Sequence, residues 1–120
     1  MAAVIASDVH PLNNLRVLKY LRADLGATDD AVQDWITRWT VAGFEALEAM
    51  VVQHGAGFCF GDTPTLADCC LVPQIYNARR FGVDLTRYPA LVAIDEACME
   101  LAAFQNAAPQ AQPDADGDAR

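Results

Sequence analysis

The sequence predicts an all-α fold, a bundle of about five helices. Apolar residues recur at spacings of three and four along every long segment, which is the period of an amphipathic helix. No long stretch shows the alternation of apolar and polar residues that is typical of a half-buried strand. The composition, 53% hydrophobic and 20% charged over 120 residues, fits one folded domain and not a disordered chain.

A first complete helix is predicted over residues 13–25. Its apolar stripe consists of Leu15, Val17, Leu18, Leu21 and Leu25. Gly26 follows and is a natural stop for a helix. Upstream, residues 1–9 have the pattern of the last turns of a longer helix. Pro11 is expected to separate these turns from the next helix, because proline removes a backbone donor and disturbs the preceding turn.

The clearest helix is predicted from Asp29 to His54. Thr28 can cap its start, and two acidic residues in the first turn suit the positive end of the helix dipole. The apolar stripe consists of Val32, Trp35, Ile36, Trp39, Gly43, Leu47, Met50 and Val51. Glycine inside a helix costs about 1 kcal/mol relative to alanine. We therefore expect a neighbouring segment to approach closely at Gly43.

A loop rich in glycine and aromatic residues, 55–61, leads to a second helix-start signal. Thr65 is followed three residues later by Asp68, which has the form of a capping box, with aspartate in place of the usual glutamate or glutamine. We interpret this pair as a structural cap without a role in catalysis. The helix that follows is apolar almost all round and ends at Gly82. Such a pattern predicts a central, buried helix.

The last helix is expected to begin at Arg87-Tyr88-Pro89. It is predicted as one element whose stripe consists of Leu91, Ile94, Cys98, Leu101 and Phe104. After Phe104 the sequence loses its periodicity and becomes rich in Ala, Gln, Pro, Asp and Gly. The prediction is a helical domain over residues 1–106 and a mobile C-terminal tail over residues 107–120.

Charge and hydropathy exclude several classes of function. The formal net charge is −8, whereas nucleic-acid binding needs a basic face that neutralises phosphates. The apolar run Met1–Ser7 is far shorter than the roughly 20 residues of a membrane-spanning helix. It also lacks the pattern of a signal peptide. We therefore expect a cytoplasmic protein that binds neither nucleic acid nor membrane.

The four cysteines show no metal-ligand spacing, and no metal site is predicted. They are Cys59, Cys69, Cys70 and Cys98. We interpret them as small apolar residues on buried helix faces in a reducing compartment. A catalytic thiol is the less favoured interpretation, because sequence places neither His10 nor His54 beside a cysteine.

Polar and basic groups crowd a helix start between His10 and Arg16. Free backbone N–H groups and the positive dipole end make such a place suited to a carboxylate. Simple helix capping by Asn13 or Asn14 explains the same pattern. The residue types alone do not choose between these two interpretations.

Three arginines lie close together in the sequence with one acid between them: Arg79, Arg80 and Arg87, with Asp84. Arg79 and Arg80 end an apolar helix, where a buried guanidinium needs an anionic partner. That partner is either a carboxylate of the protein or a substrate. An arginine that points outward needs neither, so three possibilities remain open for this pair.

Three segments carry a resemblance to a known family: 8–18 (DVHPLNNLRVL), 61–74 (GDTPTLADCCLVPQ) and 77–89 (NARRFGVDLTRYP). In order and spacing they resemble the C-terminal half of zeta-class glutathione transferases, the maleylacetoacetate and maleylpyruvate isomerases. The resemblance extends from about Asp8 to the ending at Asp114. It implies a glutathione-transferase helical domain that forms a homodimer. It also implies a thioredoxin-like N-terminal domain, which is absent from this chain.

The resemblance also implies roles for individual residues. His10, Asn14, Leu15 and Arg16 match positions beside the cofactor glutathione. Arg80 matches the family's arginine for a substrate carboxylate, and Arg79 matches a variable position, at the surface or behind the site. The implied reaction is cis–trans isomerisation of a maleyl diacid, with no metal, and the 120 residues alone are expected to be nearly inactive.

Two other functions stay open at this point. The chain could act alone as a helical interaction or scaffold module, which would not need the cationic residue Arg80 or the 10–16 cluster. Alternatively, it could belong to a glutathione-dependent enzyme that dehalogenates small 2-halo acids. Sequence does not separate the second alternative from isomerisation.

Overall fold

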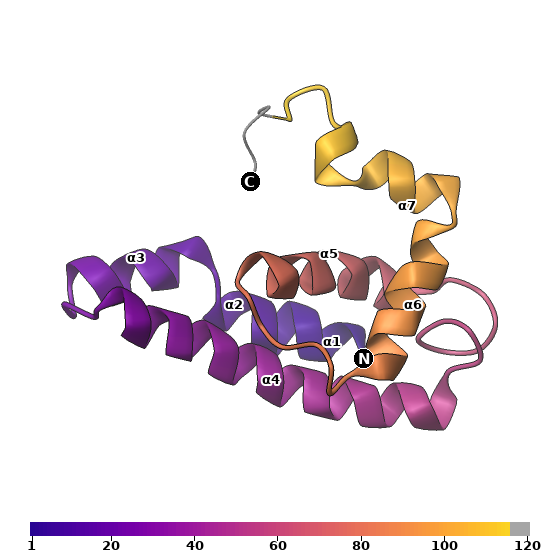
Figure 1. The fold of residues 1–120 in the computed structure, drawn as a ribbon, viewed down its shortest axis with the longest axis horizontal. Coiled ribbons are helices and arrows are strands. Elements are labelled where there is room, and N and C mark those ends of the chain that lie inside the picture. Colours follow the sequence, from indigo (N-terminus) through magenta and orange to yellow (C-terminus); the bar gives the residue numbers. More distant parts are fainter. Residues whose placement is uncertain (116–120) are drawn as a thin grey trace.

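The computed structural model describes residues 1–115, and all of its regular structure is helical (Figure 1). The elements are α1 (Ala2–Val4), the π-helical segment η1 (Ile5–Val9), α2 (His10–Leu12), α3 (Leu15–Ala23), α4 (Asp29–His54), α5 (Leu66–Arg80), α6 (Pro89–Met99), α7 (Ala102–Ala107) and the 3₁₀ turn η2 (Pro109–Ala111). Within these residues no strand forms, and one isolated bridge joins Gly55 to Gly61. The prediction of an all-α bundle of about five helices is confirmed.

Residues 2–12 form one continuous helical segment, α1 to α2. The predicted break at Pro11 is wrong, because helical structure continues to Leu12 and ends at Asn13. A π-helical turn precedes the proline, in which the backbone N–H of His10 donates to the Ile5 carbonyl. The hydrogen-bond spacing thus changes just before Pro11, and proline is tolerated in the first turn of a helix.

The long helix α4 has the bounds that its sequence predicts. Thr28 Oγ1 accepts from the backbone N–H of Ala31 at 3.2 Å, which confirms the N-cap. The residues of α4 that are buried are Val32, Ile36, Thr40, Gly43, Phe44, Leu47 and Val51. Gly43 faces Val9 so closely that an added Cβ would overlap the valine Cγ2. The expected close approach is therefore the contact of α4 with η1.

The shorter helix α3 buries much less than its stripe predicts. Among its apolar residues only Leu18 is buried, while Leu15 is 62% exposed. Leu25 lies beyond the end of α3 and is 61% exposed. The stripe correctly predicts the helix but not its burial, because α3 packs mainly against one end of α4 (Figure 1).

Helix α5 lies against the N-terminal segment and α6 (Figure 1). Leu71 and Ile75 have no exposed surface, which confirms a central position. The prediction that α5 is buried all round is wrong, however, because Leu66 is 72% exposed and Cys69 and Pro73 are also exposed. Cys69 and Pro73 line a groove beside α7.

The predicted capping box at the start of α5 is present. Asp68 Oδ2 accepts from the backbone N–H of Thr65 at 2.7 Å and from its hydroxyl at 2.9 Å. The other carboxylate oxygen, Oδ1, accepts from the backbone N–H of Cys59 at 2.8 Å. The fully buried carboxylate therefore fastens the 55–61 loop as well as capping the helix.

Helix α6 begins at Pro89 as predicted, and its cap comes from α4. The carboxylate of Glu48 accepts from the backbone N–H groups of Ala90 at 2.8 Å and Leu91 at 3.0 Å. Tyr88, at the N-cap position, makes no side-chain cap. Figure 1 shows α6 standing steeply across the ends of α4 and α5.

The predicted single last helix is wrong, because the chain turns between Met99 and Ala102. Leu101 has an extended backbone (φ −91°, ψ 128°), and α7 begins after it in a new direction, directed back over α5 (Figure 1). Neither glycine nor proline marks this turn. Within the predicted tail, Gln110 donates to the Tyr76 hydroxyl at 3.2 Å. Residues 116–120 of that tail lie outside the described residues.

Candidate functional site

The corner between α2 and α3 carries the four predicted cofactor residues. His10 is the first residue of α2, and Asn14 is the N-cap of α3. Asn14 Oδ1 accepts from the backbone N–H of Arg16 at 3.1 Å, so capping, one of the two interpretations of this cluster, is realised. Leu15 and Arg16 are both exposed beside it. The four residues thus lie at one corner of the fold, with His10, Leu15 and Arg16 exposed and Asn14 half-buried.

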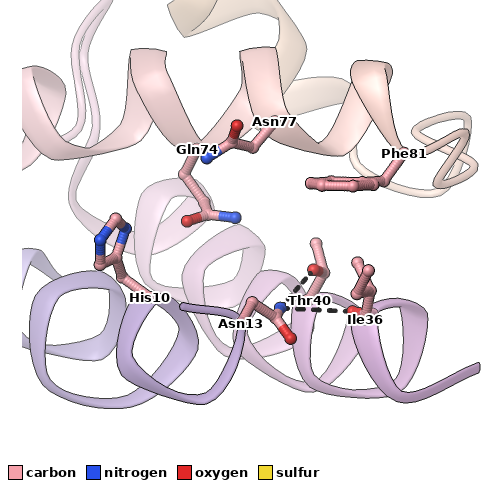
Figure 2. Close-up of a pocket in the computed structure, with 7 residues that line it drawn as sticks. All are labelled: His10, Asn13, Ile36, Thr40, Gln74, Asn77 and Phe81. Atoms are coloured by element: carbon pink, nitrogen blue, oxygen red, sulfur yellow. Dashed lines mark hydrogen bonds between the residues drawn. The ribbon is translucent and has the colours of Figure 1, made fainter. Parts of the chain in front are cut away.

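A small polar cavity of about 40 Å³ lies behind this corner (Figure 2). It is lined by His10, Asn13, Ile36, Thr40, Gln74, Asn77 and Phe81. Asn13 Nδ2 donates to the Thr40 hydroxyl at 3.2 Å and to the Ile36 carbonyl at 3.4 Å, which ties the corner to α4. No role was predicted for Gln74 from the sequence, although the two amides Gln74 and Asn77, one turn apart on a largely apolar helix, were a visible signal.

The three neighbouring arginines differ in their partners. Arg79 Nη1 lies 2.6 Å from Asp95 Oδ2, whose side chain is only 5% exposed, and Arg87 Nη2 lies 3.0 Å from Glu45 Oε1. Arg80 is exposed, and its guanidinium carbon lies 5.8 Å from the Phe81 ring centroid. Within residues 1–115, Arg80 is the member of this trio without an ion pair.

The ion pair of Arg79 settles one of the open alternatives. Its anionic partner is Asp95, a carboxylate of the protein itself on α6. The sequence could not show this, because the two residues are sixteen positions apart on different helices. Arg80 is exposed, as the third of the open possibilities allowed.

A groove of about 690 Å³ runs between α5 and the turn from α6 to α7. Its walls are mostly apolar, with Val72 and Tyr76 from α5 facing Met99 and Phe104. Arg80 lies among the charged residues of this groove, together with the Arg79–Asp95 pair. Asn77 lines both the groove and the polar cavity, so the last turns of α5 form a wall of each.

The cysteines offer no activated thiol in the core. All four are free, and Cys59 and Cys98 are buried. Burial, followed by the nearby Asp68 carboxylate, raises the pKa of Cys98 to about 12. Burial, followed by the same carboxylate, also raises the pKa of Cys59. Because the thiolate is the nucleophile, these two thiols are unreactive at neutral pH.

Residues 29–94 match the family described as glutathione S-transferase, C-terminal domain. A maleylpyruvate isomerase of a Ralstonia species is 55% identical over 116 residues, which cover 95% of this chain and 55% of that protein. The chain therefore spans about half the length of this relative.

No helix in the described part of the chain is long and apolar enough to span a bilayer.

Solved structures agree with this likeness. The holo structure of a bacterial maleylpyruvate isomerase, a zeta-class glutathione S-transferase, superposes with a TM-score of 0.92 at 53% identity, covering 96% of this chain and 55% of that one. A maleylacetoacetate isomerase from Anaeromyxobacter dehalogenans, with dicarboxyethyl glutathione and citrate in its active site, gives 0.91 at 45% identity, covering 98% and 52%.

Proposed function

This chain belongs to the glutathione S-transferase C-terminal domain family, in its zeta class, and we propose that it forms the helical half of a glutathione-dependent isomerase. The proposed substrate is a cis maleyl diacid, maleylpyruvate or maleylacetoacetate, and the product is its trans fumaryl isomer. The similar isomerases support this reaction. They do not favour the alternative of a scaffold module without chemistry.

The reaction needs no group beyond glutathione and the protein. The glutathione thiolate adds to the cis double bond, which becomes a single bond and rotates, and elimination of the thiolate then leaves the trans product. Negative charge develops on the substrate's conjugated carbonyl system during addition. The protein accelerates such a reaction by orienting the reactants and by placing cations and donors beside that charge.

The observation that carries the proposal is the state of Arg80. The two nearby arginines, Arg79 and Arg87, are already paired with carboxylates, whereas Arg80 has no ion pair within residues 1–115 and lines the large groove. A guanidinium can hold a carboxylate by two parallel hydrogen bonds. Arg80 is therefore proposed to bind a carboxylate of the diacid substrate.

Glutathione is proposed to lie against the corner formed by α2 and α3. There His10, Leu15 and Arg16 present an imidazole, an apolar side chain and a guanidinium, and Asn14 lies between them as the N-cap of α3. The relative with dicarboxyethyl glutathione in its active site supports this cofactor. The thiol itself would be activated by a thioredoxin-like domain, which lies outside these 120 residues.

The larger assembly is also part of the proposal. We expect a homodimer in the cytoplasm, acting in the degradation of aromatic compounds. The exposed apolar residues Leu15, Tyr20 and Leu25 offer a surface for another domain or subunit. Four free cysteines suit a reducing compartment.

The test joins this chain to the thioredoxin-like half of the Ralstonia maleylpyruvate isomerase. The chimera should isomerise maleylpyruvate only when glutathione is present. Arg80→Gln should lower kcat/KM for the diacid by about 10- to 100-fold, the loss of one charge-assisted contact. The KM for glutathione should stay within about twofold of its original value, because Arg80 is assigned to the substrate.

Arg87→Gln is the matched control, since it removes an exposed arginine from the same region while leaving the groove intact. It should change kcat/KM by less than about twofold. A folded chimera without activity would refute the proposed function. Equal losses in the two arginine variants would refute the role of Arg80.

A further inference from the structure

The polar cavity behind the α2–α3 corner contains a buried acceptor without a partner. Asn13 Oδ1 is buried and has no hydrogen-bond partner within residues 1–115. Its orientation is fixed, because the same amide donates through Nδ2 to the Ile36 carbonyl, which can only accept. Turning the amide over would place two acceptors against each other. The acceptor Oδ1 must therefore find its donor elsewhere.

The opposite wall of the cavity carries amides that also lack partners. Gln74 is only 5% exposed, and its side chain makes none of the hydrogen bonds found within residues 1–115. Figure 2 shows Gln74 pointing from α5 toward the helix that carries His10. Asn77 lies one turn further along α5 and lines the same space. A buried amide such as that of Gln74 is normally hydrogen-bonded, to protein or to ordered water.

The size and chemistry of the space identify its occupant. A cavity needs roughly 10–15 Å³ to hold one water molecule, and each such water needs two to four polar partners. This cavity has about 40 Å³, and its wall offers Asn13, Gln74, Asn77 and the His10 ring. No carboxylate or cationic side chain of Asp, Glu, Lys or Arg lines it, so no ion is matched. It is too small for a glutathione or a diacid.

We propose that a small cluster of ordered water molecules in this cavity joins His10 and Asn13 to Gln74 and Asn77. Through these waters Gln74 is a positioning residue for the His10 imidazole. The π-helical turn just before His10 brings this residue to the cavity mouth, and π-helical turns are frequent at functional sites. The assignment of His10 to glutathione rests on the proposed function, whereas the water cluster does not.

The first test is structural and needs no activity. A high-resolution crystal structure of the chain should show ordered water within hydrogen-bond distance of Asn13 Oδ1 and the Gln74 amide. Water-to-amide magnetisation transfer in the NMR spectrum should place the same long-lived water beside Asn13. A direct hydrogen bond between Gln74 and Asn13, or a dry cavity, would overturn the proposal.

The second test uses Gln74→Met, which keeps the side-chain length and removes both polar atoms. The waters should be lost, and the His10 ring should occupy more than one orientation. In the chimera described above, the KM for glutathione should rise about three- to tenfold while kcat changes less than about twofold. Gln53→Met, an exposed change on α4, is the control and should leave both constants unchanged.

The outcomes separate the two proposals. An inactive chimera whose crystals show the waters would refute the isomerase function and leave the water cluster standing. If Gln74→Met fails to fold, the wild-type crystal and NMR measurements still decide. An ordered His10 and an unchanged glutathione KM in a folded Gln74→Met variant would refute the positioning role.

Discussion

The carboxylate of Asp68 provides the sharpest test of how this fold is held together. Replacing it with alanine removes four hydrogen bonds at once, one of them from the Cys98 thiol, and leaves the backbone N–H groups of Cys59 and Thr65 without their acceptor. An unpaired buried donor costs about 1–3 kcal/mol. A surface cap alone would cost about 1 kcal/mol. Because Asp68 has no exposed surface, we expect Asp68→Ala to lower the free energy of unfolding by about 3–5 kcal/mol.

Urea denaturation followed by circular dichroism measures this change, with the slope m expected to stay constant. Asp84→Ala is the matched control, since Asp84 Oδ1 accepts one backbone N–H at the exposed surface, from Thr86 at 2.9 Å. The control should lose no more than about 1 kcal/mol. Equal effects of the two substitutions would show that the 55–61 loop does not depend on Asp68.

The same carboxylate makes stability depend on pH. Burial on its own would raise the pKa of Asp68, but hydrogen bonds from Cys59 and Thr65 outweigh it and hold the pKa below its usual value of 3.8. A group with a lowered pKa in the folded state stabilises the protein above its usual pKa, and this contribution is lost as the pH falls through the folded value. Wild-type stability should therefore fall below about pH 4, and Asp68→Ala should flatten that part of the profile.

Two further predictions concern packing and thiol chemistry. Gly43→Ala should destabilise the fold by about 1–3 kcal/mol, because the new Cβ overlaps Val9. Val9→Ala in the same chain should restore part of the lost stability. If Gly43→Ala instead stabilised the fold by about 1 kcal/mol, as helix propensity alone predicts, the close contact would be contradicted. A thiol reagent at neutral pH should modify the exposed Cys69 in the native chain but Cys98 only after unfolding. Equal rates of labelling at Cys69 and Cys98, measured by mass spectrometry of the native chain, would refute this prediction.

The parts of the fold that sequence predicted are those with local causes. Thr28 and its acidic neighbours fix the start of α4, and Thr65 with Asp68 fixes the start of α5. Gly82, with φ +67°, follows the end of α5 as expected of a residue that tolerates the left-handed region. Each of these signals acts between residues a few positions apart, which is why the sequence shows them.

The parts that sequence missed have distant causes. The turn at Leu101 depends on how α7 is held over α5, and no glycine or proline marks it. The partner of Arg79 is on another helix, as is the cap of α6. The exposure of Leu15 depends on what α3 packs against, which periodicity cannot specify. The cavity behind His10 arises only where three helices meet.

The cap that Glu48 supplies to α6 couples the two halves of the chain during folding. Forty-two residues separate Glu48 from the amide that it accepts at Ala90. Helix α6 has only 11 residues, and isolated helices of that length are marginal in water. Its first turn therefore gains this acceptor only once α4 has docked beside it. Hydrogen exchange at the amides of Ala90 and Leu91 thus reports the docking of α4, and these amides should open together with the core rather than by fraying.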